Sequence, residues 1–390
     1  MSPHFATERA QQQLLALLKI PGLSGEEMAV ADHIEKVLRA AGCKPAWLRR
    51  MPAQPPLPPK FGMGNLVVQL PGTLAAPCRM FLAHLDTVPL CRGAVPVVRD
   101  GRIVARGHTA LGGDNRAGVA ALVAVAEAIL KHKLPHPPLT FLFTVGEEVG
   151  LYGAKSVQPT DVGDPAMAFN FDSGRPEEII TGAIGAQRWR AELHGISSHA
   201  GMHPERGASA ILIASRALAE VADRGWFGKI QKGSKSGTSN AGIIHGGEAT
   251  NQVTHHVVVR GESRSHDPVF TRRITEAYLL AFERAARRVR TCDGEHGRVE
   301  FFSENDYQPF RLKDRAPIVR FTRQIAGELG LATKCVAING GLDANPLNEA
   351  GIPTVTLGVG AHHPHAYDEY VDLAEFATGC RLTLALATAR

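Results

Sequence analysis

The chain has 390 residues, of which 44% are hydrophobic and 21% are charged, with a net charge of +5. This composition is typical of a soluble globular protein, and the length is sufficient for two domains. The small, dispersed positive charge argues against a broad nucleic-acid-binding surface, and no stretch approaches the roughly 20 uninterrupted apolar residues of a membrane span.

The cysteines and the amino terminus indicate the compartment. The six cysteines are scattered and show no Cys-x-x-Cys spacing, which is most simply explained by reduced thiols in the cytosol. The amino terminus lacks the basic start and the apolar core of a signal peptide. We therefore expect a cytoplasmic protein. The densest basic segment, residues 284–290, continues an apolar helical pattern without interleaved aromatic residues, which favours a solvated helix face over a nucleic-acid contact.

Two helices and a loop are predicted at the start of the chain. Residues 7–18 carry apolar side chains at helical spacing. The segment Ser24-Gly25-Glu26-Glu27 has the pattern of a capped helix start, and this second helix is expected to run to about Leu38. Five prolines between Pro52 and Pro59 then predict a loop or a polyproline turn.

Short apolar runs and helical patterns alternate in the next part of the chain. A long helix is predicted for residues 117–131. The runs that suit strands buried on both faces are residues 80–83, 139–145, 166–171 and 353–357. This alternation predicts an α/β fold in which a sheet is flanked by helices.

The middle of the chain predicts a smaller α+β domain inserted into the first one. Half-exposed strands are expected at residues 188–194 and 255–262, and helices at residues 208–221 and 268–290. A Gly/Ser-rich loop is expected at residues 233–239. The expected order of elements is strand, helix, strand, strand, helix, strand. We therefore predict a discontinuous first domain of residues 1–184 and 304–390, and an inserted domain of residues 185–303.

Several residues that can bind metals lie at the predicted strand ends. His84, the pair Glu147-Glu148, and Asp172 each follow an apolar run, and Asp114 comes just before the long helix. Because ligands of open α/β sheets bind beyond the carboxyl ends of the strands, these groups are expected to converge. Burying so many carboxylates without cations would be prohibitive.

The residue types indicate a pair of metal ions. Imidazole and carboxylate ligands suit zinc, and a shared carboxylate can bridge two ions about 3.5–4 Å apart. Asp86 is placed to accept the second ring N–H of His84 and so to fix its tautomer. The neighbours Glu147 and Glu148 are expected to point in different directions, so that one is a ligand and the other a general base on water.

Each of these signals is weak by itself. A His-x-Asp string occurs often by chance, a Glu-Glu pair is usually a solvated turn, and an Asp at a strand end is usually a turn former or a helix cap. Their combination, in this order and in these contexts, favours a metal-dependent hydrolase.

The sequence also resembles the M20 metallopeptidases over nearly its whole length. Residues 83–88 (Ala-His-Leu-Asp-Thr-Val), 111–118 (Leu-Gly-Gly-Asp-Asn-Arg-Ala-Gly) and 144–150 (Thr-Val-Gly-Glu-Glu-Val-Gly) are similar to the first three signatures of that family. Residues 340–345 and 365–371 resemble strings of its peptidase T branch. The resemblance implies a zinc-peptidase catalytic domain with a mixed sheet flanked by helices, and an inserted lid domain that also forms dimers.

The resemblance implies a role for each candidate residue. Asp114 would bridge two divalent ions, His84 and Asp172 would complete one site, and Glu148 and His365 the other. Glu147 would be the general base, and Asp86 would orient His84. The ions would be Zn²⁺, although Mn²⁺ or Co²⁺ can replace zinc in such ligand sets.

The sequence departs from the common family pattern at two positions, one of them in the loop around Asp114. Asn115 stands where the family commonly has a second Asp, and Asp172 stands where many members have Glu, which is usual in the peptidase T branch. Members hold this loop with a cis peptide, so a non-proline cis bond is expected between Asp114 and Asn115.

The inserted domain carries a motif of its own. Residues 195–201 (Gly-Ile-Ser-Ser-His-Ala-Gly) look like the lid motif of the family, whose His reaches the active site of a partner subunit and stabilises an oxyanion. His199 by itself would suggest a surface loop residue. Asn251 and Arg264 match lid positions, where an Arg can clamp a substrate carboxylate or form a structural salt bridge.

The resemblance implies a tripeptide aminopeptidase that acts as a homodimer on short peptides. The charge pattern and the lack of a long apolar stretch predict no nucleic-acid and no membrane partner. Substrate-binding roles would fall to Asn251, Arg264, Gly340, Asp343 and Asn345. A carboxypeptidase, a dipeptidase, an N-acyl amino acid amidohydrolase and an inactive peptide-binding homologue stay open as alternatives. His362 and His363 compete with His365 as ligands, but only His365 has the Glu four residues later that matches the family pattern.

Overall fold

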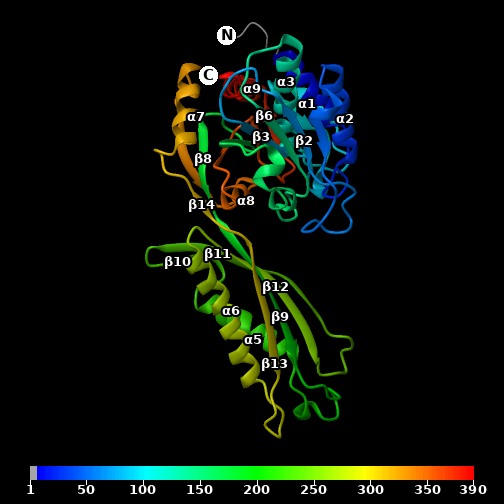
Figure 1. Cartoon of the computed structure of the whole chain (residues 1–390). Coiled ribbons are helices and arrows are strands. Elements are labelled where there is room, and N and C mark those ends of the chain that lie inside the picture. Colours follow the sequence, from blue (N-terminus) through cyan, green and yellow to red (C-terminus); the bar gives the residue numbers. More distant parts are fainter. Residues whose placement is uncertain (1–6) are drawn as a thin grey trace. The chain divides into compact units, whose positions relative to one another are not determined.

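The computed structural model describes residues 7–390, which form two compact units (Figure 1). Unit 1 comprises the residues up to Gly182, Arg311–Ile338 and Leu342–Arg390, and unit 2 comprises Ala183–Phe310 and Asn339–Gly341. Residues 1–6, where the stretch tested for a signal peptide begins, lie outside the described residues.

Unit 1 is built on a nine-stranded mixed sheet in the order β1-β2-β6-β3-β7-β16-β8-β14, with β15 paired to β8. The strand β3 runs parallel to β6 and β7, and β16 runs parallel to β7, whereas β2 and β8 are antiparallel to their neighbours. The strands are Leu48–Arg50 (β1), Leu66–Leu70 (β2), Arg79–His84 (β3), Leu139–Thr144 (β6), Met167–Phe171 (β7), Glu178–Ala183 (β8), Phe310–Arg311 (β14), Lys334–Ile338 (β15) and Thr354–Leu357 (β16).

The four runs predicted as buried strands form β3, β6, β7 and β16, at the centre of this sheet. Every residue of β3 and β6 is buried, as expected for strands covered on both faces. The rings of Phe81, Phe141 and Phe169 lie side by side on these strands and form part of the core. The α/β fold predicted from the alternation is therefore confirmed.

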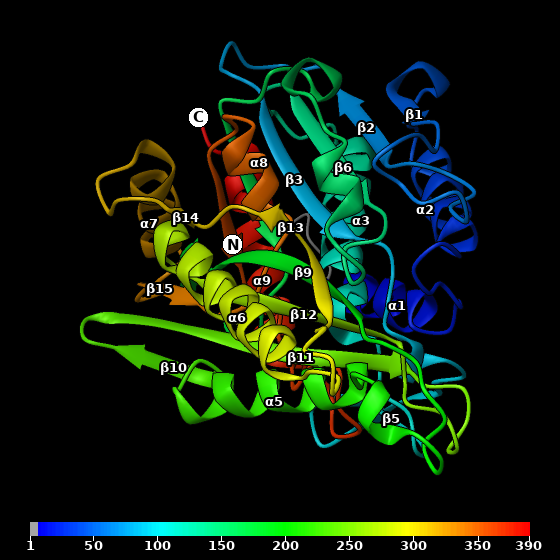
Figure 2. The ribbon, with the colours of Figure 1, turned by 90° about the horizontal axis from the view of Figure 1, so that it is seen from below.

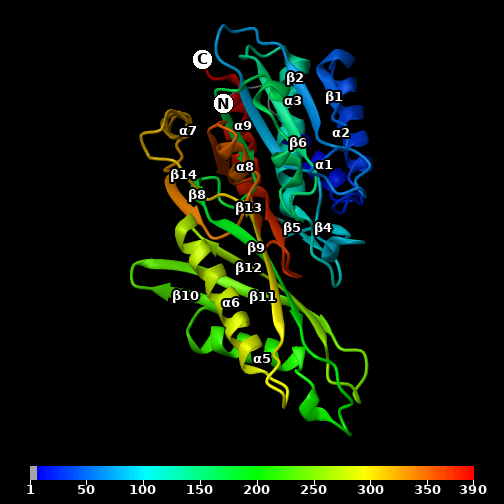
Figure 3. The same ribbon diagram turned by 60° about the horizontal axis from the view of Figure 1, so that its bottom comes forward.

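Helices pack against this sheet (Figure 3), and α3 has more buried residues than any other helix of unit 1. It contacts β3 and the helices α1, α2 and α9, and its apolar residues are buried along most of its length. A second, four-stranded sheet has the order β17-β18-β5-β4. The remaining elements of unit 1 are α1 (Thr7–Leu17), α2 (Met28–Ala40), α3 (Gly113–His132), α4 (Tyr152–Lys155), α7 (Pro317–Glu328), α8 (Ala344–Glu349), α9 (Leu373–Thr388), β4 (Pro96–Arg99), β5 (Arg102–Ala105), β17 (Ala361–His362) and β18 (Tyr370–Asp372).

The predicted cap of the second helix is wrong. Helix α2 begins at Met28, and its cap residue Glu27 makes no side-chain capping hydrogen bond. The Ser24 hydroxyl instead donates to the Asp86 carboxylate at 2.6 Å. The Ser24 side chain thus binds a residue that is distant in the sequence, although the local pattern predicted that it caps the helix.

Unit 2 is a five-stranded sheet in the order β10-β11-β12-β9-β13, and two helices pack on one of its faces. Helix α6 contacts β9, β12 and α5 (Figure 2). The elements are β9 (Gly185–His194), α5 (Ala210–Asp223), β10 (Gly228–Lys232), β11 (Lys235–Gly246), β12 (His256–Ser265), α6 (Pro268–Arg288) and β13 (Arg298–Tyr307).

Two details of unit 2 differ from the prediction. The Gly/Ser-rich run at residues 233–239 is largely strand, because Lys235 to Ser239 pair with β10 in a hairpin (Figure 3). Three consecutive strands therefore stand where two were expected. The predicted insert of residues 185–303 ends inside β13, and the compact unit extends to Phe310.

In the described part of the chain, none of the helices has both the length and the apolar character needed to cross a membrane.

Candidate metal centre and active site

The carboxylate of Asp114 lies between two histidines. Its Oδ1 atom is 3.0 Å from Nε2 of His84, and its Oδ2 atom is 3.4 Å from Nε2 of His365. The two oxygens of one carboxylate thus face different imidazoles. This is the arrangement that a bridging carboxylate needs in order to hold two ions.

Each histidine has one further carboxylate beside it. Oδ1 of Asp172 is 3.6 Å from Nε2 of His84, and the Glu148 carboxylate is 2.9 Å from Nε2 of His365. Ligand atoms of His84, Asp114 and Glu148 all lie within 4.8 Å of one another. Two His-carboxylate sets that share Asp114 fit a pair of divalent cations with imidazole and carboxylate ligands.

The sheet topology explains why these residues meet. His84 is the last residue of β3, Asp172 follows β7, and Glu148 lies in the turn after β6. Because β6, β3 and β7 are parallel neighbours, their carboxyl ends share one edge of the sheet. Asp114 joins them from the start of α3, and His365 from the segment between β17 and β18.

Asp86 contacts His84 and also the turn that carries the two glutamates. Nδ1 of His84 is 3.0 Å from the backbone carbonyl of Asp86 and 3.4 Å from its carboxylate. The carboxylate accepts the backbone N–H groups of Glu147 and Glu148 at 3.1 and 3.2 Å. Asp86 therefore fixes the imidazole chiefly through its main chain, and its side chain holds the turn that presents the two glutamates.

Glu369 is a site residue to which the sequence analysis gave no role. Its carboxylate accepts hydrogen bonds from the backbone N–H groups of Leu111, Gly112 and Asp114, at 2.8, 2.8 and 2.9 Å. The side chain is only 2% exposed. It thereby fixes the loop that presents Asp114. Its position four residues after His365 was the only sequence signal that singled it out.

Two more buried side chains support the same edge and were also missed. The carboxylate of Glu27 accepts the backbone N–H groups of Gly25 and Gly146, at 2.9 and 3.1 Å. The guanidinium of Arg116 donates to the carbonyl oxygens of Leu85, Ile20 and Gly22. Both connect separate loops, which sequence spacing cannot show.

The departure at Asn115 has a structural account. The bond between Asp114 and Asn115 is cis, as predicted from the resemblance. Oδ1 of Asn115 accepts the backbone N–H of Gly118 at 3.1 Å, so the side chain caps the continuous part of α3. An Asp at this position could make the same contact.

Burial and charge shift the titration of the site. Burial raises the pKa of Glu147 well above its usual value, and the neighbouring Asp172 and Asp343 carboxylates add to this shift. Burial also raises the pKa of Glu148 and of Asp172. Hydrogen bonds to Asp114 and Glu148 raise the pKa of His365 to about 10. These shifts have one cause: four carboxylates are crowded into a buried site, and protons relieve the negative charge when no cation is bound. A bound cation would take the place of these protons.

The competing histidines lie in other contacts. His362 Nε2 pairs with the Glu375 carboxylate, and His363 Nδ1 lies 2.7 Å from the Asp368 carboxylate. His365 faces both Asp114 and Glu148. The geometry therefore favours His365 over its two neighbours as a ligand.

The substrate-binding candidates of unit 1 are buried beside the centre. Asp343 and Asn345 are each 1% exposed. Asp343 accepts the hydroxyl of Thr144 through one oxygen, while its other oxygen, Oδ1, has no hydrogen-bond partner among the described residues. Burial raises the pKa of Asp343 to about 7. Asn345 accepts the backbone N–H of Leu342 at 3.0 Å.

The candidates of unit 2 do not form one cluster. His199 is exposed, and its Nδ1 accepts the backbone N–H groups of Gly201 and Met202. Arg264 donates to Glu262 at 2.8 and 3.0 Å, which is the salt bridge weighed against a substrate clamp. Asn251 is exposed, and its backbone carbonyl accepts the N–H of Ala200. Gly340 belongs to the short segment that completes this unit.

Comparisons with known proteins identify the family of this chain. Residues 80–389 match the family described as Peptidase family M20/M25/M40. The chain is 33% identical over 326 residues to the protein YqjE of Bacillus subtilis (strain 168). The match covers 83% of this chain and 84% of that protein.

Two crystal structures are similar over almost the whole chain. A tripeptidase from Staphylococcus aureus is 30% identical, with a TM-score of 0.85, and the match covers 99% of this chain and 98% of that one. The aminopeptidase PepT from Bacillus cereus is 29% identical, with a TM-score of 0.81 and 99% of both chains covered.

Proposed function

This chain belongs to the peptidase family M20/M25/M40, and on that premise we propose that it is a dinuclear aminopeptidase that releases amino-terminal residues from tripeptides. The family makes it a metallopeptidase, a hydrolase of peptide bonds. The placement of Asp114 between His84 and His365 carries the proposal of two ions. The Staphylococcus aureus tripeptidase and the Bacillus cereus aminopeptidase support the substrate class.

The ligands are assigned from the two sets that share Asp114. His84 and Asp172 would hold one ion, and His365 and Glu148 the other. Zinc suits this donor set best, and Mn²⁺ or Co²⁺ can replace it. When bound, the ions would polarise the scissile carbonyl and acidify the attacking water.

Glu147 is assigned as the general base. It is held beside the ligands by the hydrogen bond from its backbone N–H to Asp86. Its carboxylate accepts a proton from the attacking water as the water oxygen bonds to the carbonyl carbon. It then gives this proton to the leaving amine, and the peptide C–N bond breaks as the tetrahedral species collapses. Burial raises the pKa of Glu147, and a more basic carboxylate accepts the proton more readily.

The oxyanion and the substrate ends are assigned to other residues. His199 would donate a hydrogen bond to the tetrahedral oxyanion from a partner subunit, which requires a homodimer formed through the lid domain. Asn251, Arg264, Gly340, Asp343 and Asn345 would contact the peptide. The buried carboxyl group of Asp343 suits the amino terminus of a peptide, because its Oδ1 atom lacks a partner among the described residues. We place the enzyme in the cytoplasm, as the scattered cysteines suggest.

Substrate cleavage tests this assignment. Purified enzyme loaded with zinc would be assayed with tri-alanine, di-alanine, N-acetylated tri-alanine and an N-acetyl amino acid. A tripeptide aminopeptidase cleaves tri-alanine at least tenfold faster than the others and releases free alanine together with the dipeptide. Preferential turnover of the dipeptide or of an N-acetylated compound would instead establish the alternative dipeptidase, carboxypeptidase or amidohydrolase activity.

A further inference from the structure

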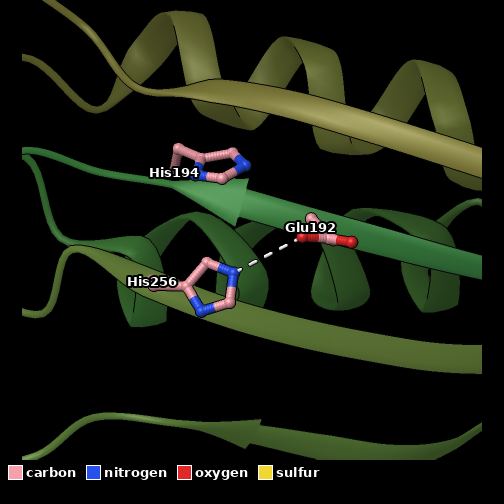
Figure 4. A group of neighbouring side chains, drawn as sticks. All are labelled: Glu192, His194 and His256. Carbon is pink, nitrogen blue, oxygen red and sulfur yellow. Dashed lines mark ion pairs between the residues drawn. The ribbon is translucent and has the colours of Figure 1, made fainter.

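A second group of metal-binding side chains lies on the sheet of unit 2. His194 and Glu192 are on β9, and His256 is on the neighbouring strand β12 (Figure 4). One ligand atom from each of the three residues can be chosen so that all lie within 4.8 Å of one another. We propose that these residues bind a divalent transition-metal ion of the zinc type, separate from the catalytic pair.

The register of the sheet brings the three residues together. His256 lies directly opposite His194 in the antiparallel pair, and Glu192 is two residues before His194 on the same face of β9. Leu193, which lies between them on β9, belongs to the core under α5 and α6. The two imidazoles and the carboxylate therefore project from the opposite face, which bears no helix of unit 2.

The contacts leave ligand atoms free for an ion. The Nε2 atom of His194 is buried and has no hydrogen-bond partner among the described residues. The Nε2 atom of His256 is 3.7 Å from Oε2 of Glu192, and the Arg190 guanidinium occupies the other oxygen of Glu192. The Nε2 atom of His194 lies 3.5 Å from the Glu300 carboxylate without forming a hydrogen bond to it, which is costly for a buried atom, and an ion at this point would satisfy it.

Glu300, on the other strand that neighbours β9, is placed to be a fourth ligand. Oε1 of Glu300, on β13, is 3.5 Å from Nε2 of His194 and 3.2 Å from a guanidinium nitrogen of Arg298. Two imidazoles and one or two carboxylates form a set that suits zinc and disfavours the oxygen-seeking Mg²⁺ and Ca²⁺. Ligand atoms of a tetrahedral zinc site are roughly 3.3 Å apart. Side-chain rotations that move the ligand atoms by about 1 Å would therefore bring them to this spacing.

An ion at this point would tie β9, β12 and β13 together. The side chains are 27% exposed for His194, 18% for Glu192 and 41% for His256. This partial exposure gives an ion a route in from solvent. The site would thus stiffen the middle of the sheet without entering the chemistry at Asp114.

Zinc content tests the proposal on the full-length protein. Wild-type protein and the double variant His194→Ala/His256→Ala would be dialysed against the same buffered zinc concentration, and bound zinc would be counted by elemental analysis. We expect the double variant to hold one zinc ion per chain fewer than the wild type. Equal zinc content in the two proteins would overturn the proposal and leave the group as an ion-pair cluster.

Two further variants keep the result specific. His266→Ala removes a histidine just after the same strand β12, whose Nε2 atom lies 3.1 Å from Oδ1 of Asn339, and it should retain the wild-type zinc content. Glu192→Gln keeps the shape of the carboxylate side chain and should weaken zinc binding at this site at least tenfold. Circular dichroism verifies that each variant is folded, and activity is not part of the readout, so the result is independent of the proposed peptidase specificity.

Discussion

The backbone amide of Asp114 donates a 2.9 Å hydrogen bond to Oε1 of Glu369, a residue 255 positions later in the chain. The other carboxylate oxygen of Glu369 accepts two more amides of the same loop. Both oxygens of Glu369 are thus engaged by the loop that carries the proposed bridging ligand, and we assign Glu369 as a positioning residue for Asp114.

Replacing Glu369 tests this role. In Glu369→Gln, one carboxylate oxygen becomes an amide nitrogen that cannot accept a backbone N–H, so the loop loses contacts on one side. We expect the apparent affinity for zinc to fall roughly 10- to 100-fold, as measured by reactivation of chelated enzyme. Glu375→Gln removes a nearby carboxylate that pairs with His362 and should leave the affinity unchanged. Equal affinities in the two variants would refute the positioning role.

Glu147→Gln separates the proposed base from the ligands. The amide cannot accept a proton from water, so kcat should fall by about 10²-fold or more, while zinc content stays at the wild-type level. In Glu148→Gln the loss should appear in zinc content as well, because Glu148 faces His365. Retained turnover in Glu147→Gln would exclude this residue as the base.

His365 and its neighbour His363 provide a paired comparison. His365→Ala removes the imidazole that lies between Asp114 and Glu148, and should cost one zinc ion per chain. His363→Ala removes an exposed imidazole that pairs with Asp368 and should cost none. Elemental analysis of both variants measures the difference, and loss of zinc from His363→Ala alone would move the ligand to that position.

Asn115 offers a test of the helix cap. In Asn115→Ala the backbone N–H of Gly118 loses its acceptor, and the free energy of unfolding should fall by about 1 kcal/mol. Asn115→Asp keeps an oxygen at the same place and should be destabilised less. Urea unfolding in the presence of a chelator measures both, and a greater loss in the Asp variant would show that added negative charge outweighs the cap.

Glu27 is expected to make stability depend on pH. Burial raises its pKa from 4.5 to about 7, so between these values the folded state holds a proton that the unfolded chain has lost. Its contribution to stability is therefore complete below about pH 4.5 and is lost as the pH rises through 7, by up to about 3 kcal/mol. Unfolding free energies at pH 5 and pH 7.5 should differ less in Glu27→Gln than in the wild type, whereas Glu26→Gln, at an exposed neighbour, should behave like the wild type.

The sequence determined the central sheet and the candidate ligands. The apolar runs of β3, β6, β7 and β16 are recognisable because strands buried on both faces admit few polar residues. Polar residues that end such runs, such as His84 and Asp172, are conspicuous for the same reason. The family resemblance then grouped them, and the comparisons established the family.

Short-range patterns failed where a distant partner decided the outcome. Ser24 had the pattern of a helix cap but donates to Asp86, and the Gly/Ser-rich run after Gly233 became part of a strand that pairs with β12 as well as with β10. Side-chain and backbone hydrogen bonds of this kind depend on segments that are far apart in the chain. Local propensity cannot anticipate them.

Only the tertiary structure decided how the ligand loop is supported and where the second histidine cluster forms. Glu369 meets the amides of Leu111, Gly112 and Asp114 because β18 pairs with β5, and His194 meets His256 because β9 and β12 share a register. The sequence determines which side chains can accept a proton, a hydrogen bond or a metal. Strand pairing and loop closure bring them within a few ångströms of one another, where hydrogen bonds and metal coordination can form and where electrostatic attraction is strongest.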